Sequence, residues 1–139
     1  MSTDRAGMQR ALQTAVVPAL RERGFTGSFP HFRRITDEKT DLLTFQFDRY
    51  GGGFVLAIAE RRPGQFTGWR ENVPASKLTA FTITPPNRCR LQPGSGGDVE
   101  SWFRYDDGQE PAQLAAQVLE YLPEADAWWT GQRKQPHLR

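Results

Sequence analysis

Residues 41–61 contain the two most clearly patterned strands of the sequence. From 43 to 48 apolar and polar side chains alternate, which is the period-two pattern of a strand with one buried face. Residues 54–59 are apolar at every position, which predicts a central strand covered on both faces. The three glycines at 51–53 predict a tight antiparallel connection, because glycine readily adopts the positive φ angles of such turns. We therefore expect a β-hairpin at the centre of a sheet.

Helices are expected on both sides of this hairpin in the sequence. Apolar residues recur at spacings of three and four between Met8 and Leu20, which is the pattern of an amphipathic helix. Pro18 interrupts that pattern and is expected to kink the helix on its solvent side. Pro111 suits the first turn of a C-terminal helix, and Pro123 is expected to begin a further helical piece. The segment 131–139 has the composition of a solvated tail.

Further strands are predicted near 31–36, 89–91 and 101–105, with a short one within 78–84. Residues 63–88 form a long proline-rich segment that carries aromatic side chains, and loops of this length are often functional. The order is helix, four or five strands, then helices. It predicts an α+β fold in which an N-terminal helix and C-terminal helices pack on a mostly antiparallel sheet. The long segment is expected to cover part of the other sheet face.

Length and charge narrow the classes of function. The 139 residues suit a single domain, and a net charge of +2 is lower than that of a typical strong nucleic-acid binder. The chain starts on an amphipathic stretch rather than an apolar signal core, and no apolar run approaches the roughly 18 residues of a membrane span. With a single cysteine, an internal disulfide is impossible. The expected setting is the cytoplasm, without membrane association.

The sequence offers little catalytic chemistry. The two histidines, His31 and His137, lie far apart, so neither a metal site nor a cofactor is expected. Cys89 with His31 is the sole imaginable nucleophile–base pair, and nothing flanking Cys89 resembles a nucleophile elbow. The glycines at 51–53 are not a phosphate loop, because no Lys-Ser/Thr follows them and a strand comes next. No catalytic residue is assigned, and an enzyme that uses Cys89 is the least favoured alternative.

Arginines next to aromatic residues are the one pattern that indicates a binding surface. Arginine stems that lie over core aromatic rings would produce the same pattern without any ligand. We expect a non-enzymatic module that binds another protein through Gln46, Asp48, Arg49, Tyr50 and Trp69. The alternative is a nucleic-acid-associated protein that uses Arg33, Arg34, Arg49, Arg61 and Arg62. Neighbouring strand residues point to opposite faces, however, so Arg33 and Arg34 are not expected in one tight patch.

Several segments together resemble one protein family. They are Leu-Arg-Glu-Arg-Gly-Phe at 20–25, Phe-Arg-Arg at 32–34, Phe-Gln-Phe-Asp-Arg-Tyr-Gly at 45–51, Arg-Leu at 90–91 and Ser-Trp-Phe at 101–103. Over about residues 5–122 the chain resembles the bacterial DUF4304 family. The resemblance implies a small cytoplasmic α+β domain and supplies no catalytic residues, since the name denotes unknown function. Small bacterial domains of this build often serve in toxin–immunity or defence loci, which is an analogy alone.

Overall fold

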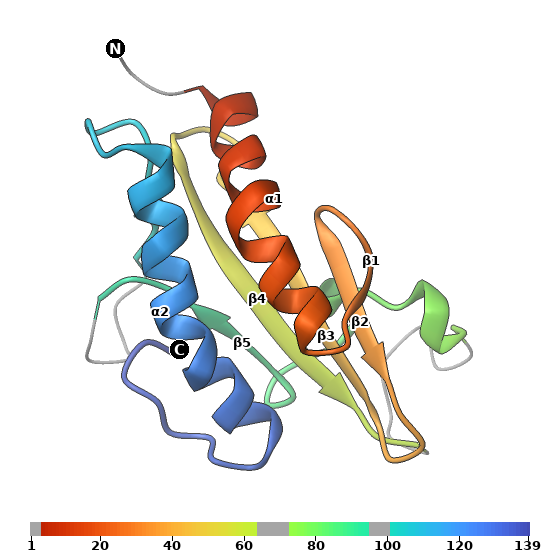
Figure 1. Cartoon of the computed structure of the whole chain (residues 1–139). Coiled ribbons are helices and arrows are strands. Elements are labelled where there is room, and N and C mark those ends of the chain that lie inside the picture. The colour runs from red at the N-terminus through yellow and green to blue at the C-terminus, as the bar shows by residue number, and fades with distance from the viewer. Residues whose placement is uncertain (1–3, 64–72, 95–100) are drawn as a thin grey trace.

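The computed structural model describes residues 4–63, 73–94 and 101–139. Helices α1 and α2 lie side by side on one face of an antiparallel sheet, which confirms the α+β class expected from the sequence (Figure 1). In chain order the elements are α1 (Arg5–Glu22), β1 (Thr26–Ser28), β2 (His31–Ile35), β3 (Thr40–Phe47), β4 (Gly53–Arg61), the 3-10 turns η2 (Ala75–Lys77) and η3 (Ala80–Thr82), β5 (Arg88–Leu91), β6 (Phe103–Arg104) and α2 (Pro111–Trp129).

The sheet is organised around β3 and β4. Its order is β1-β2-β3-β4-β5, and β6 also pairs with β4. The β3–β4 hairpin runs from the pair Thr40–Arg61 to the pair Phe47–Phe54, as the alternating and apolar patterns predict. On the other edge of β4, β5 pairs with residues 56–59 and β6 with residues 53–54. The described residues thus form six strands rather than four or five, and the strand that the sequence did not predict is the short β1 at the edge of the sheet.

One face of the hairpin packs against both helices. Alternate residues of the two strands enter this core, and so does the apolar stripe of α1 from Met8 to Leu20. The core strand residues are Leu43, Phe45, Phe54, Leu56 and Ile58. Neither described helix is long and apolar enough to cross a membrane. Burial of these side chains is the main favourable term in folding, at roughly 25 cal/mol per Å² of apolar area.

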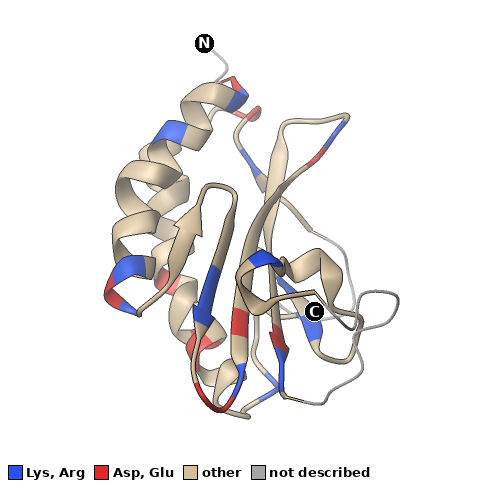
Figure 2. Cartoon of the chain, turned by 90° about the vertical axis from the view of Figure 1, so that its right-hand side faces the viewer, with Lys and Arg blue, Asp and Glu red and all other residues tan. Residues whose placement is uncertain are grey.

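The other face of the hairpin is covered by the segment that follows β4. Leu42, Ala57 and Ala59 pack there in a second apolar cluster, to which this segment contributes Leu78, Ala80 and Ile83. The view in Figure 2 shows the helices on one side of the sheet and this segment on the other. The prediction of a central strand buried on both faces is therefore confirmed. The short strand expected within 78–84 is wrong, since 3-10 turns hold these apolar side chains against the sheet.

The glycines between β3 and β4 are needed for a reason other than the one expected. None of the three has a positive φ angle. A Cβ on Gly52 would lie 2.4 Å from the Cβ of Asp106, and one on Gly53 would lie 2.8 Å from the Cβ of Trp102. The Gly52 carbonyl also accepts a hydrogen bond from the Tyr105 N–H at 2.9 Å. Close approach of the β6 segment is what excludes side chains from this turn.

Helix α2 continues through Pro123, so the separate C-terminal helical piece was a wrong prediction. Pro123 is exposed, and its ring therefore faces solvent instead of interrupting the core. The apolar stripe extends beyond it to Trp128 and Trp129, which are both buried. Packing of these rings favours a continuous helix despite the missing backbone donor. Pro18 is likewise exposed within a continuous α1.

A cluster of charged side chains joins the far end of the hairpin to the end of α2. Asp41 and Glu60 face each other across β3 and β4, and they are only 4% and 2% exposed. Lys39 Nζ lies 3.0 Å from Asp41 Oδ1 and 2.5 Å from Glu60 Oε2. Arg34 pairs with Asp41 at 2.8 Å, and Arg133 donates to Glu60. Two like charges directly opposite each other would be destabilising without these cations.

The same cluster contacts the helix backbone and its aromatic rings. Lys39 Nζ also donates to the carbonyl of Trp129, while Trp129 Nε1 donates to the Ala59 carbonyl at 3.0 Å. Burial alone would raise the pKa of Glu60. The hydrogen bonds and charges of Lys39 and Arg133 more than offset this and hold that pKa below its ordinary value. In Figure 2 charges of both signs gather at this end of the molecule.

We predict that Glu60→Gln lowers the free energy of unfolding by about 3 kcal/mol at pH 7, because it removes the buried carboxylate charge that Lys39 and Arg133 share and leaves Asp41 as the remaining partner of Lys39. The folded-state pKa of Glu60 is depressed, so its contribution is complete at neutral pH. It is lost as the pH falls below the unfolded value of about 4.3. The difference between wild type and Glu60→Gln should therefore narrow in acid, as measured by urea unfolding from pH 7 to pH 3. Glu120→Gln, on the exposed face of α2, is the control and should change stability by less than about 0.5 kcal/mol. A pH-independent difference would contradict the role of this charge.

Candidate binding site

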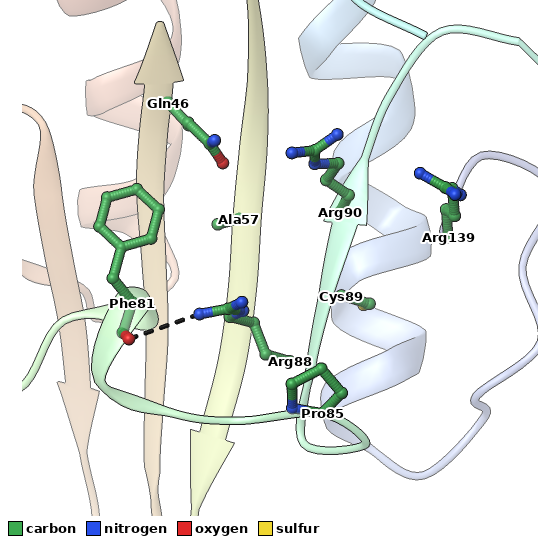
Figure 3. A pocket seen from close by; sticks show the side chains of 8 residues that line it. All are labelled: Gln46, Ala57, Phe81, Pro85, Arg88, Cys89, Arg90 and Arg139. Carbon is green, nitrogen blue, oxygen red and sulfur yellow. Dashed lines mark hydrogen bonds between the residues drawn. The ribbon is translucent and has the colours of Figure 1, made fainter. Parts of the chain in front are cut away.

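A pocket lies on the sheet face opposite the helices, next to the segment that covers the second apolar cluster. Its volume is about 270 Å³. Figure 3 shows how side chains from β3, β4, β5, the 81–85 segment and the C-terminal segment surround it. The lining residues are Gln46, Ala57, Phe81, Pro85, Arg88, Cys89, Arg90 and Arg139.

Strand register places two of the arginines above a small floor. Arg88 pairs with Ala59 and Arg90 pairs with Ala57, so both arginines project to the same face as these alanines. The alanine side chains are short, and the space above Ala57 therefore stays open between Gln46 and β5. Arg88 Nη1 donates to the Phe81 carbonyl at 3.4 Å, and the Arg90 guanidinium lies 5.2 Å from the Trp102 ring centroid.

The C-terminal segment brings a third guanidinium to the pocket. Arg139 and Arg90 exchange two backbone hydrogen bonds of 3.0 Å, and Leu138 lies opposite Leu91 with only 8% of its surface exposed. The expectation of a solvated tail over 131–139 is therefore wrong at its end. Burial of the Leu138 side chain and backbone hydrogen bonds with Arg90 and Gln92 at the edge of β5 hold the segment there.

Contacts with α2 hold this segment in place. The His137 N–H donates to Glu124 Oε1 at 2.8 Å, and His137 Nδ1 lies 2.5 Å from Glu124 Oε2. The imidazole also stacks on the Tyr121 ring at a centroid distance of 3.9 Å. Through these contacts α2 determines where Arg139 lies.

The charge of the pocket favours an anionic ligand. Its lining residues include three arginines and no Asp or Glu. Each guanidinium carries five N–H donors in a planar arrangement that matches two carboxylate or phosphate oxygens. Phe81 is 47% exposed and adds an apolar surface next to these donors.

The structure does not bring Cys89 and His31 together. Cys89 packs with the helix-side core, whereas His31 bonds Thr44 Oγ1 at 2.9 Å and contacts the Phe81 ring on the opposite face. Burial raises the pKa of the Cys89 thiol to about 12, although the charge of Arg133 partly opposes this. Burial, followed by the charge of Arg33, lowers the pKa of His31, so its imidazole is neutral at pH 7.

The residues expected to bind a protein are divided among separate places. Gln46 lines the pocket. Asp48, Arg49 and Tyr50 lie in the turn after β3, where Tyr50 is 90% exposed and its N–H donates to Asp48 Oδ1 at 3.0 Å. Trp69 lies outside the described residues. Of this set, Gln46 is the residue that the structure places beside the three arginines.

The arginines considered for nucleic acid do not form one surface. Arg33 donates to the Leu78 carbonyl at 2.9 Å, whereas Arg34 pairs with Asp41 on the helix side, as the strand alternation predicted. Arg61 donates to the Val73 carbonyl, and Arg62 Nε lies 3.8 Å from Glu60 Oε1. Arg49 belongs to the turn at the opposite end of β3.

Sequence reasoning overlooked the arginines that do come together. Arg90 lies on the strand predicted at 89–91, whereas Arg88 lies one residue before it, in the segment predicted as a loop. The structure begins β5 at Arg88, and the period-two rule then places both arginines on one face. Arg139 had no comparable signal, because its position depends on the pairing of the C-terminal segment with β5.

Comparison with known proteins gives a family. The family model described as a domain of unknown function, DUF4304, matches residues 16–132, which is most of the chain. The chain belongs to this family, as the resemblance of its segments implied. No curated protein and no solved structure matches it.

We predict that Cys89 reacts slowly with iodoacetamide. The thiolate is the reactive form, and raising the thiol pKa to about 12 leaves very little thiolate at pH 7.4. Alkylation measured by mass spectrometry should be about a hundredfold or more slower in the folded protein than in the same chain unfolded in urea. Equal rates in the two states would show an accessible, activated thiol and would restore Cys89 as a candidate nucleophile.

Proposed function

We propose that this member of the DUF4304 family is a non-enzymatic binding module that receives an acidic segment of a protein partner. The binding site is the pocket of Gln46, Arg88, Arg90 and Arg139, which we name the basic pocket. The observation that carries the proposal is that Arg88, Arg90 and Arg139 line one pocket, with no Asp or Glu among the lining residues.

The energies of charged hydrogen bonds support a specific contact between a carboxylate and the arginines of the basic pocket. A hydrogen bond that involves a charged group contributes about 1.5–3 kcal/mol, whereas an exposed ion pair alone contributes about 0–1 kcal/mol. The walls of Gln46 and Phe81 and the floor of Ala57 partly remove a bound carboxylate from water. They therefore favour the stronger kind of contact.

A protein partner fits this site better than nucleic acid. The net charge is only +2, and the arginines outside the pocket that were considered for nucleic acid do not form one surface. Nucleic-acid binding draws its affinity from many phosphate contacts along an extended basic surface. The half-exposed Phe81 ring beside the pocket instead suits a side chain of a protein segment.

The test is affinity capture from lysate of the native host, with and without nuclease, followed by mass spectrometry. Wild-type protein should retain a partner after nuclease treatment. The double variant Arg88→Gln/Arg139→Gln should capture at least about tenfold less of this partner than the wild type does, because it removes two charge-assisted contacts. The control is Arg10→Gln, which removes a positive charge from the exposed side of α1 and should leave capture unchanged.

Three outcomes would contradict the proposal. Partners that disappear with nuclease would indicate the nucleic-acid alternative. Equal capture by wild type and Arg88→Gln/Arg139→Gln would place the binding surface elsewhere, with Arg49 and Tyr50 next to be tested. Capture of no protein by the wild type would also count against a protein partner.

A further inference from the structure

A second hollow adjoins the basic pocket at the beginning of β5. Its volume is about 530 Å³. Both hollows are lined by Pro85, Arg88, Cys89 and Arg139, so they adjoin each other at this end of the strand. The residues found only in the second are Pro86, Asn87, Trp128 and Arg133, and we name it the edge hollow.

The edge hollow has a different chemical character from the basic pocket. Its apolar walls are the two proline rings, the neutral Cys89 side chain and the edge of Trp128. The Arg133 guanidinium stacks on Trp128 at 3.9 Å from the ring centroid and also donates to Glu60. Its charge is thus already balanced by a buried carboxylate. A site with these walls accepts an apolar side chain, while Arg88 and Arg139 at its border attract an acidic one.

The docked C-terminal segment shows how an extended chain would use both hollows. Along this segment Leu138 enters the helix-side core, and the next residue, Arg139, lines the basic pocket on the other face. The start of β5 alternates in the same way, since Arg88 projects to the face of the basic pocket and Cys89 packs with the helix-side core. An extended partner segment beside these residues presents neighbouring side chains to opposite faces. One faces the edge hollow and the other faces the basic pocket.

We infer that the partner segment carries a large apolar residue directly next to its acidic residue. The acidic side chain binds Arg88 and Arg139 in the basic pocket, and its apolar neighbour fills the edge hollow between Pro86 and Trp128. This inference rests on the proposed function and adds the chemistry that distinguishes one acidic segment from another. Charge alone would accept any acidic segment, whereas an apolar anchor in an adjoining hollow restricts the choice.

The test begins with a random heptapeptide phage library selected on the immobilised full chain. Wild-type protein should enrich peptides in which Asp or Glu is adjacent to a large apolar residue. Asn87→Phe places a ring in the edge hollow, and this variant should enrich acidic residues without the apolar neighbour. Gln113→Phe adds the same ring to the exposed face of α2 and should select as wild type does.

A second measurement does not depend on any variant of the protein. An enriched peptide is synthesised with capped ends, and it is compared by calorimetry with versions that lack either the apolar or the acidic side chain. Replacing the apolar residue by Ser should weaken binding at least about tenfold, the loss expected when a large apolar side chain is no longer buried. Replacing the acidic residue by its amide should also weaken binding.

The outcomes separate this inference from the proposed function. Enrichment of acidic residues without an apolar neighbour, or a change of less than about twofold on the apolar-to-Ser replacement, overturns the inference and leaves the basic pocket as the site. A library that yields no acidic enrichment on the wild-type protein overturns both. Enrichment of adjacent apolar and acidic residues that persists in Asn87→Phe also overturns the inference, because the apolar anchor would then bind elsewhere.

Discussion

Burial of β4 on both faces is the constraint on which the rest of this structure depends. Residues 53–60 are all buried, which requires one cover on each side of the strand and partners along both of its edges. The two helices supply one cover, and the segment with η2 and η3 supplies the other. On the second face this cover ends beside Ala57, and the basic pocket begins there. The candidate site therefore lies where the apolar cover of the central strand stops.

Charged contacts join the end of the β3–β4 hairpin to the end of α2. Lys39, Asp41 and Glu60 hold the end of the hairpin against Trp129, and Arg133 joins the same cluster directly after α2. From there the chain returns to β5, where His137 contacts Glu124 and Arg139 enters the pocket. The position of the Arg139 guanidinium therefore depends on where α2 ends and the chain turns back toward β5. A change in the buried cluster would alter the pocket without touching its lining residues.

The period-two and helical patterns predicted the parts of the fold that local burial decides. The hairpin, the α1 stripe and the two-sided cover of β4 follow from which positions are apolar. Contacts between distant segments were not predictable in this way. Position 52 must be glycine because Asp106 packs against its backbone. Residues 137–139 are held in place because they pair with the edge of β5. Among the residues of the candidate site, Gln46 was predicted as a binding residue because it is a polar position of the alternating strand. Strand alternation could have placed Arg90, whereas Arg88 lay outside the predicted strand and Arg139 depends on a distant pairing.

The central claim is that the arginines of the basic pocket contact an acidic segment. The most direct test is a nuclear magnetic resonance titration that follows the Nε–Hε signals of arginine and the Gln46 side-chain amide while a capped tetraglutamate peptide is added. The account predicts saturable shifts for Arg88, Arg90, Arg139 and Gln46, which share the pocket, and constant signals for Arg10 on the exposed side of α1. Small, non-saturating shifts of similar size in all the arginines would contradict it. They would show that the peptide meets only a diffuse positive charge.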